Sequence, residues 1–165
     1  MVCTIRHLEP DDVPALHAIL TSPNVVDGSM RLPYSPLSST AARLVPKDGH
    51  HVLVAEDDGE VLGFAELATY PHIPRHAHAG ELYMIAVRED RQGQGIGRSL
   101  VAAVLDLADR WLMLDRIGLV VWVRNTHAVK LYESFGFQIE GTLRQYARWQ
   151  GTLIDAHTMG RLRAS

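Results

Sequence analysis

Cysteine is nearly absent from this sequence, which contains only Cys3. A single cysteine cannot form a disulfide within the chain. Nothing around Cys3 indicates an activated thiol, so we interpret it as a residue of the first strand. With 47% hydrophobic residues, the chain is apolar enough to build a core of ordinary size without covalent links.

Long apolar runs are also missing. The N-terminal residues as far as Asp12 contain no apolar stretch long enough for a signal peptide. The longest fully apolar run near the C-terminal half, Leu119–Val123, is far too short to cross a bilayer. We therefore expect no membrane segment and a cytoplasmic location.

Neither sign of charge dominates, because 16 Lys and Arg residues stand against 19 Asp and Glu residues, for a formal net charge of −3. No basic stripe stands out, which argues against a general nucleic-acid binder. Any anion that the chain binds is expected to be held locally. The sequence has no internal repeat, low-complexity segment or dividing linker, so residues 1–165 are expected to form a single domain.

Glycine is concentrated in one stretch, R-Q-G-Q-G-I-G-R-S, from Arg91 to Ser99. Its three glycines alternate with other residues between an apolar run and a long amphipathic segment. Glycines at such a place let the backbone approach a ligand and turn sharply into a helix, whose first N–H groups have no partner inside the helix. These amides, the helix dipole and the two flanking arginines favour a bound phosphate.

Two familiar phosphate loops do not fit this spacing. For G-x-x-x-x-G-K-[ST], the first glycine would fall on Gln92, and Arg98 takes the place of the lysine. A dinucleotide fingerprint G-x-G-x-x-G that starts at Gly93 ends at Arg98, and one that starts at Gly95 ends at Leu100. Neither end position is a glycine, so both nucleotide interpretations are set aside.

Apolar periodicity and turn residues predict the element order β-α-α-β-β-β-α-β-α-β-β. The Asp-Gly pair at 58–59 predicts a hairpin, and residues 21–36 are dense in turn-formers and suit a substrate loop. The expected strands cover residues 2–8, 51–56, 61–70, 80–87, 116–123, 137–149 and 152–162, and the expected helices cover 11–20, 39–44, 99–114 and a segment that begins at 125 or 126 and ends at 136.

The helix after the glycine stretch carries apolar residues at steps of three and four, which predicts a continuous buried stripe. The members of this stripe are Ile96, Leu100, Val104, Leu107, Trp111 and Leu114. The run 116–123 is apolar on both faces, which is typical of a strand that is covered on both sides in the middle of a sheet.

Two sequence motifs resemble those of the GNAT family of N-acetyltransferases. The stretch Gln92 to Gly97 matches Q/R-x-x-G-x-G/A, and N-T-H-A-V-K-L-Y-E-S-F-G-F, about 30 residues later, matches N-x-x-A-x-x-x-Y-x-x-x-G-F. Both stand in the family's order, and the matching strand and helix order covers nearly the whole chain. The resemblance implies an α/β (α+β) GNAT fold, with a mixed and largely antiparallel sheet of about seven strands flanked by helices.

The C-terminal sequence from Phe135 to Leu162 resembles the branch that includes phosphinothricin-type and L-amino acid N-acetyltransferases. The resemblance implies direct transfer of an acetyl group from acetyl-coenzyme A to a primary amine in a ternary complex, with no metal. A free amino acid or a similar small amine is the favoured acceptor. Neighbouring branches acetylate protein N-termini or polyamines, because fold does not fix the substrate. A rival of another class is a non-catalytic acyl-coenzyme A sensor.

The resemblance also implies a set of cofactor contacts. The strand before the glycine loop would pair its backbone with the pantetheine amides. Asn125 either touches the cofactor or only caps its helix, and Lys130 either meets a phosphate or is a solvated charge. Backbone amides of the loop would hold the pyrophosphate. The implied residues are Ile85, Ala86 and Val87 in the strand, and Gln92, Gly93, Gln94, Gly95, Ile96, Gly97 and Arg98 in the loop.

For catalysis, Tyr132 corresponds to the family's tyrosine that protonates the leaving thiolate. The alternative is a half-buried helix aromatic beside Leu131. Glu81, at the start of the strand that leads into the site, is the first candidate for the base that deprotonates the amine, and the alternative is a strand-edge carboxylate that faces solvent. Glu66 is a lesser candidate for the base.

Three further expectations concern the surroundings of the site. Arg31 and Tyr34 are candidates for acceptor contacts because of their position in the loop 21–36. The histidines of the loop P-H-I-P-R-H-A-H match no strong ligand pattern, so we interpret them as surface or substrate-entry residues and expect no metal. Family habit and the long C-terminal hairpin suggest a homodimer.

Overall fold

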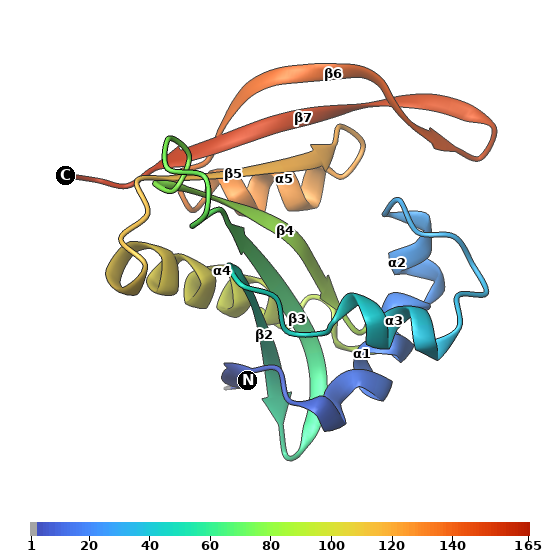
Figure 1. The fold of residues 1–165 in the computed structure, drawn as a ribbon. Coiled ribbons are helices and arrows are strands. Elements are labelled where there is room, and N and C mark those ends of the chain that lie inside the picture. Colours follow the sequence, from blue (N-terminus) through green and yellow to red (C-terminus); the bar gives the residue numbers. More distant parts are fainter. Residues whose placement is uncertain (1–2) are drawn as a thin grey trace.

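Seven strands form one sheet in the order β1-β2-β3-β4-β5-β7-β6 in this computed structural model, which describes residues 3–165 (Figure 1). The pair β4–β5 is parallel and the other neighbours are antiparallel, which confirms the mixed, largely antiparallel sheet. The strands are β1 (Thr4–His7), β2 (His50–Asp57), β3 (Glu60–Thr69), β4 (Ala79–Val87), β5 (Arg116–Trp122), β6 (Gln138–Trp149) and β7 (Thr152–Leu162).

Helices cover the two faces of this sheet unevenly. Residues of α4 and α5 belong to a core cluster with β3, β4 and β5, while α1 and α2 pack with β2 and β3 in a second cluster. The helices are α1 (Val13–Leu20), α2 (Pro23–Asp27), α3 (Leu37–Arg43), α4 (Ile96–Asp106) and α5 (Thr126–Glu133), with short helical turns η1 (Pro10–Asp12), η2 (Glu89–Arg91) and η3 (Leu107–Trp111).

The hairpin predicted at Asp58-Gly59 is confirmed, and the β6–β7 hairpin has the same kind of turn. Asp58 and Gly59 have φ values of 49° and 80°, and the Gln150-Gly151 pair has 46° and 80°. Two consecutive residues of positive φ match the twist of antiparallel strands. The predicted strand boundaries around both turns are therefore confirmed to within about two residues. Of the expected first strand, residue 2 lies outside the described residues.

One helix was not predicted. The helix α2 occupies part of the stretch 21–36, which we expected to be a loop. Pro23 stands at its N-terminus, where a proline without an N–H group costs nothing, and Gly28 follows its end. Val25 anchors the helix in the second core cluster. Five residues give too few repeats for helical periodicity to show in the sequence.

The predicted apolar stripe is wrong at Trp111, whose exposed fraction is 71%. The α-helix ends at Asp106 and continues as a π-helical turn, in which the N–H of Leu112 donates to the carbonyl of Leu107 at 2.9 Å. A π-turn adds one residue to a helical turn and rotates every later residue about the axis. The stripe therefore stays buried up to Val104, while Trp111 turns to solvent and Leu114 is buried beyond the turn.

The strand β5 lies inside the sheet, between β4 and β7, which confirms its expected place. It is not covered on both faces as expected, because the exposed fraction of Val120 is 38%. Leu119 and Val121 belong to the core, whereas Val120 faces the cleft described below. The second apolar face of this strand is thus a cleft wall.

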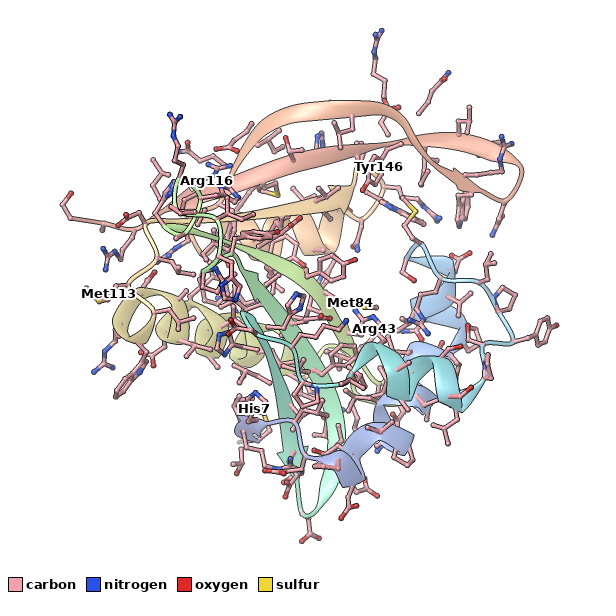
Figure 2. All side chains as sticks on the ribbon, viewed as in Figure 1. His7, Arg43, Met84, Met113, Arg116 and Tyr146 are labelled. Atoms are coloured by element: carbon pink, nitrogen blue, oxygen red, sulfur yellow. The ribbon has the colours of Figure 1, made fainter. Side chains whose placement is uncertain are left out.

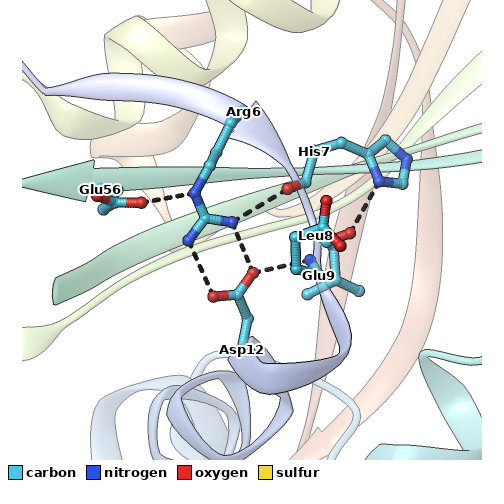
Figure 3. Close-up of polar contacts among 6 residues, drawn as sticks. All are labelled: Arg6, His7, Leu8, Glu9, Asp12 and Glu56. Atoms are coloured by element: carbon cyan, nitrogen blue, oxygen red, sulfur yellow. Dashed lines mark hydrogen bonds and ion pairs between the residues drawn. The ribbon is translucent and has the colours of Figure 1, made fainter. Parts of the chain in front are cut away.

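A partly buried ion pair fixes the first strand to the turn that follows it (Figure 3). The Arg6 guanidinium donates to both carboxylate oxygens of Asp12, at 2.7 and 2.9 Å, and to Glu56 on β2 at 2.5 Å. The same Asp12 carboxylate accepts from the backbone N–H of Glu9 at 2.8 Å. The Arg6 hydrogen bonds hold the pKa of Asp12 below its usual range. Among residues 3–165, no helix is long and apolar enough to cross a membrane.

Candidate functional site

The sheet opens between β4 and β5. These two strands pair only from Ala79–Glu81 to Arg116–Gly118, and they diverge beyond that point. On the other side of β4, Glu66 pairs with Met84 and Leu67 pairs with Leu82, so that Tyr83 is an extra residue in a β-bulge. A bulge bends its strand and increases its twist. The bulge and the divergence together produce a cleft of about 1010 Å³.

One wall of the cleft is the free edge of β4. The residues after Glu81 pair with β3 on one side, while their backbone groups on the other side face the gap. Such an edge can pair with an extended ligand as with another strand. Ile85, Ala86 and Val87 all line the cleft, as the prediction for pantetheine contacts requires.

The glycine loop closes one end of this wall. Gly93 and Gly95 have φ values of 74° and 84°, in the left-handed region that favours glycine. The first helical bond of α4 runs from the N–H of Ser99 to the carbonyl of Gly95, at 3.0 Å. The preceding amides, those of Ile96, Gly97 and Arg98, are the ones that a helix leaves without internal partners. All three residues line the cleft.

The space around this loop suits an anion. A Cβ atom added at Gly93 or Gly95 would meet nothing within 4 Å, so the backbone lies open to a ligand. Arg91, Arg98 and Lys130 bring positive charge to the same end of the cleft. Arg98 donates to the Ser134 hydroxyl at 3.0 Å, which ties the start of α4 to the end of α5.

Of the residues expected to contact the cofactor, Gln94 does not line the cleft. Its side chain is exposed, whereas Gln92 does line the cleft. The Asn125 side chain accepts from the N–H of Ala128 at 3.2 Å, so it caps α5 and also lines the cleft. The cap holds the N-terminus of α5, the helix that carries Tyr132, against the cleft.

Tyr132 lies on α5 and lines the cleft from the side opposite β4. Its exposed fraction is 6%, and its ring packs edge-on against Phe137 with the ring centroids 5.8 Å apart. Burial raises the pKa of Tyr132 to about 12. The phenol is therefore held in one place and protonated at neutral pH.

Glu81 and Glu66 have different surroundings. Glu81 lies at the last β4–β5 pair, lines the cleft and accepts from the Tyr70 hydroxyl at 2.9 Å. Glu66 is 5% exposed, accepts from Arg43 at 2.6 Å and lies 3.3 Å from His50. The carboxylate of Glu66 thus serves an internal ion pair and is not among the cleft-lining residues.

The other end of the cleft is formed by the N-terminal helices and the C-terminal hairpin. Arg31 lines it, as expected, whereas Tyr34 is 98% exposed and stands outside it. Sequence reasoning missed Arg43, Tyr83 and Tyr146, which also line the cleft. Figure 2 shows Arg43 beside Met84 and Tyr146 on β6, on the side of the hairpin. No sequence motif marks these three positions, because the bulges and the packing of α3 place them there.

The histidines of the loop after β3 serve local contacts. His72 contacts Asp48, and the His76 ring packs against Tyr70 with the ring centroids 4.9 Å apart. Across the described part of the chain, no three His, Cys, Asp or Glu side chains are arranged to hold a metal ion.

Comparison with known sequences agrees with this geometry. A family model described as "Acetyltransferase (GNAT) family" matches residues 13–137. The L-amino acid N-acetyltransferase AaaT of Escherichia coli is 33% identical, over 96% of this chain and 97% of that protein. A spermidine N(1)-acetyltransferase of Vibrio cholerae is 31% identical, over 94% and 90% of the two chains. The phosphinothricin N-acetyltransferase of Alcaligenes faecalis is 30% identical, over 92% and 80%.

Solved structures share the fold over almost their whole length. A ribosomal-protein-alanine N-acetyltransferase from Brucella melitensis superimposes with a TM-score of 0.84 and 28% identity, covering 97% of this chain and 99% of the other. A spermidine N-acetyltransferase from Vibrio cholerae, in complex with CoA and spermine, gives a TM-score of 0.85 and 29% identity, covering 97% and 95%.

Proposed function

The chain belongs to the acetyltransferase (GNAT) family, and from this premise we propose that it acetylates the primary amine of a free amino acid or a similar small acceptor. It is an N-acetyltransferase that uses acetyl-coenzyme A. One observation carries the proposal: the free edge of β4, the glycine loop, Glu81 and Tyr132 all border one cleft. Donor site, base and acid thus have a common space in which to act.

The residues present fit acetyl-coenzyme A. The cleft of about 1010 Å³ has the size of a site for a large ligand. The amides at the start of α4 would hold the pyrophosphate, and the backbone of β4 from Ile85 to Val87 would pair with the pantetheine arm. When bound, acetyl-coenzyme A supplies an activated acyl group and a thiol as leaving group.

The amine must lose a proton before it can attack. The α-amino group of a peptide, with a pKa near 8, is neutral about one time in ten at pH 7, which leaves about 1.4 kcal/mol for a base to supply. The carboxylate of a free amino acid raises the pKa of its amine further, so the base has to supply more than this. We assign this role to Glu81, whose carboxylate lies where β4 and β5 separate. The Tyr70 hydroxyl donates to Glu81 Oε2, which orients the carboxylate and leaves its other oxygen for the amine or for an intervening water.

We assign to Tyr132 the role of general acid, which donates a proton to the leaving group. It gives its proton to the sulfur of the departing thiol, a step for which general acids contribute about 10²- to 10⁴-fold. Burial keeps the phenol protonated at neutral pH, since it raises the pKa of Tyr132 to about 12. The packing against Phe137 holds the ring on the cleft wall.

The acceptor is proposed from relatives as well as from the cleft. The E. coli relative that covers nearly the whole chain is named an L-amino acid N-acetyltransferase. Polyamine and ribosomal-protein acetyltransferases are similar to the chain at slightly lower identity, and they define the rival acceptors. A sensor that binds acyl-coenzyme A without turnover is the rival of another class.

Replacing Tyr132 with Phe tests the enzymatic proposal. We expect the kcat of amine-dependent thiol release to fall by about 100-fold or more, because the proton donor is lost, while the affinity for coenzyme A stays the same. Tyr34→Phe, the same substitution at a residue outside the cleft, serves as the control and should leave kcat and KM unchanged. A Tyr132→Phe enzyme with the wild-type kcat would remove this tyrosine from the chemistry.

We also propose a homodimer and a cytoplasmic location. The long β6–β7 hairpin supports the dimer, because it exposes Ile139, Leu143 and Leu153 on the outer part of the sheet. A monomeric mass in light scattering would contradict the dimer.

A further inference from the structure

The charged residues of the cleft are distributed unevenly. Among the described residues that line it, Glu81 is the one carboxylate, whereas the cations are Arg31, Arg43, Arg91, Arg98 and Lys130. The last three border the glycine loop and are accounted for by the phosphates of the donor. Arg31 and Arg43 come from the N-terminal helical region, far along the sequence from that loop. Their charge is not used by the donor site.

The guanidinium group of Arg31 has a single hydrogen-bond partner among the described residues. Its Nε donates to the carbonyl of Leu20 at 3.1 Å, at the end of α1, which fixes the base of the guanidinium. Burial and the neighbouring charge of Arg43 lower the pKa of Arg31. A second guanidinium close enough to oppose the charge of Arg31 makes this end of the cleft attractive to an anion.

Arg43 has donor capacity to spare. Its Nη2 donates to Glu66 at 2.6 Å and lies 3.6 Å from the sulfur of Met84, whereas its Nη1 is buried and has no hydrogen-bond partner among the described residues. An unpaired buried donor is costly, and a carboxylate oxygen is the partner that guanidinium groups bind best. Glu66 neutralises one of the two arginines, so the pair keeps a surplus of one positive charge.

We propose that Arg31 and Arg43 bind the carboxylate of the acceptor, so that the acceptor is an α-amino acid with a free carboxyl group. This inference rests on the proposed acetyltransfer and adds the group by which the acceptor is recognised. A carboxylate beside the two arginines supplies the missing negative charge and accepts from the terminal N–H groups of Arg31. Arg31 and Arg43 then determine specificity, while Glu81 and Tyr132 carry the proton transfers.

The same charges disfavour the rival acceptors. A polyamine carries several positive charges, and a site for it requires carboxylates along the cleft, where the described lining contains only Glu81. Like charges brought together in an interface oppose binding. A peptide N-terminus has an amide where an amino acid has its carboxylate, so it also leaves the arginines without an anion.

Three matched acceptors test the proposal: an amino acid, its carboxamide and the corresponding amine without a carboxyl group. We expect the wild-type enzyme to prefer the amino acid in kcat/KM by roughly 10- to 100-fold, the effect of one charged hydrogen bond. Arg31→Met should raise KM for the amino acid by a similar factor, with little change for the carboxamide. Arg31→Lys, which keeps the charge, should restore part of the preference.

Controls separate recognition from folding. Arg110→Met removes an exposed arginine on η3, outside the cleft, and should change nothing. Removing Arg43 alone leaves the Glu66 carboxylate buried and unpaired, so Arg43→Met is combined with Glu66→Met. The double variant should lose the preference for the amino acid in the same direction as Arg31→Met.

A binding measurement separates this inference from the proposed function. Calorimetry in the presence of coenzyme A compares an N-acetyl amino acid with its carboxamide, and it requires no turnover. Tighter binding of the acid, lost in Arg31→Met, supports the carboxylate site even if no amine is acetylated. Equal use of all three acceptors by an active enzyme, or equal losses for acid and amide in Arg31→Met, overturns the inference and leaves the acetyltransfer intact.

Discussion

Two carboxylates on neighbouring strands have different roles because of their partners. Glu66 is bound by Arg43 and His50 in the interior, while Glu81 receives a single hydrogen bond from Tyr70 and borders the cleft. The Glu66 carboxylate is engaged in the interior and is not among the residues that line the cleft. The partners therefore favour Glu81 over Glu66 as the base.

Replacing Glu81 with Gln tests this assignment through its pH dependence. At pH 7 we expect kcat to fall by about 100-fold, because the amine is mostly protonated and has no base. The deficit should shrink between about pH 8 and 10, where an α-amino group loses its proton to solvent. Glu133→Gln, at an exposed residue of α5 outside the cleft, is the matched control. A loss that is the same at every pH would contradict the role of base.

The sequence predicted the motif positions, but of the residues at the other end of the cleft it indicated Arg31 alone. Tyr132 and the glycines follow from a local pattern, so their place in the cleft could be anticipated. The alternatives for Glu81 could not be separated, because the bulge at Tyr83 shifts the register of β4 and so decides which residues share a face. Arg43 gave no signal, since its place depends on how α3 packs against β4.

The element that organises the site is the turn from the glycine loop into α4. Gly95 is the residue immediately before α4, and its φ of 84° lies in the left-handed region. The backbone therefore passes from a left-handed to a right-handed conformation at the start of the helix. This conformation aims the amides of Ile96 to Arg98 at one point. The element works through backbone geometry and not through side chains.

Two substitutions of similar size at Gly95 separate backbone strain from bulk. Asn tolerates the left-handed region, whereas Val is strained there by about 1–2 kcal/mol. Because a Cβ atom meets nothing within 4 Å, contact with the protein does not distinguish the two. We expect Gly95→Val to weaken the binding of coenzyme A, measured by calorimetry, by about tenfold more than Gly95→Asn. Equal Kd values and equal unfolding temperatures for the two variants would contradict a role for the φ angle.

At the element scale, local turn chemistry was a better guide than periodicity. Both hairpins have the turns expected from their glycines. The buried positions of the long amphipathic helix were predicted correctly up to Val104. The pattern of apolar residues does not indicate the π-turn that exposes Trp111. The helix α2 was not predicted because its five residues are too few to show the spacing of apolar residues that marks a helix.

The whole molecule is a sheet that is divided over most of its length. In the described part of the chain, β4 and β5 are paired in register at three positions, from Ala79–Glu81 to Arg116–Gly118. Across the opening, Trp149 of the hairpin tip donates to Asp27 at the end of α2, at 2.8 Å. In Figure 1, α2 lies on the same side of the molecule as the tip of the β6–β7 hairpin. The cleft thus has paired strands at one end and a polar bridge at the other.

We expect the ion pair between Arg6 and Asp12 to contribute to the stability of the whole fold. Asp12→Asn should lower the free energy of unfolding at pH 7 by about 1–3 kcal/mol, because Arg6 loses a charged partner. Arg6 lowers the pKa of Asp12, so this contribution is present above about pH 4 and is lost as the pH falls through the lowered pKa. Urea unfolding at pH values from 7 to 3 should show the difference from wild type narrowing.

The control for this prediction is the adjacent residue. Asp11 is exposed, and Asp11→Asn should change stability by less than about 0.5 kcal/mol at either pH. A deficit of Asp12→Asn that is as large at pH 3 as at pH 7 would show that the ion pair is not its cause.

At the scale of the molecule, the fold could be predicted and the cleft only in part. The order of elements and the two motifs indicated the GNAT fold, and the sheet order confirms it. The end of the cleft at the glycine loop is formed largely by one continuous stretch, from Ile85 to Arg98, so it could be predicted from the sequence. The acceptor end joins residues of α2, α3 and β6 with the loops beside them, which only the folded chain brings together.

Acetyl transfer to a free amino acid is best tested by measuring the free thiol that the wild-type protein releases from acetyl-coenzyme A with a panel of amino acids, their carboxamides, peptides and polyamines. We predict release that depends on the amine, is fastest with a free amino acid and yields the N-acetyl amino acid. Binding of acetyl-coenzyme A without amine-dependent release across the whole panel would contradict the account.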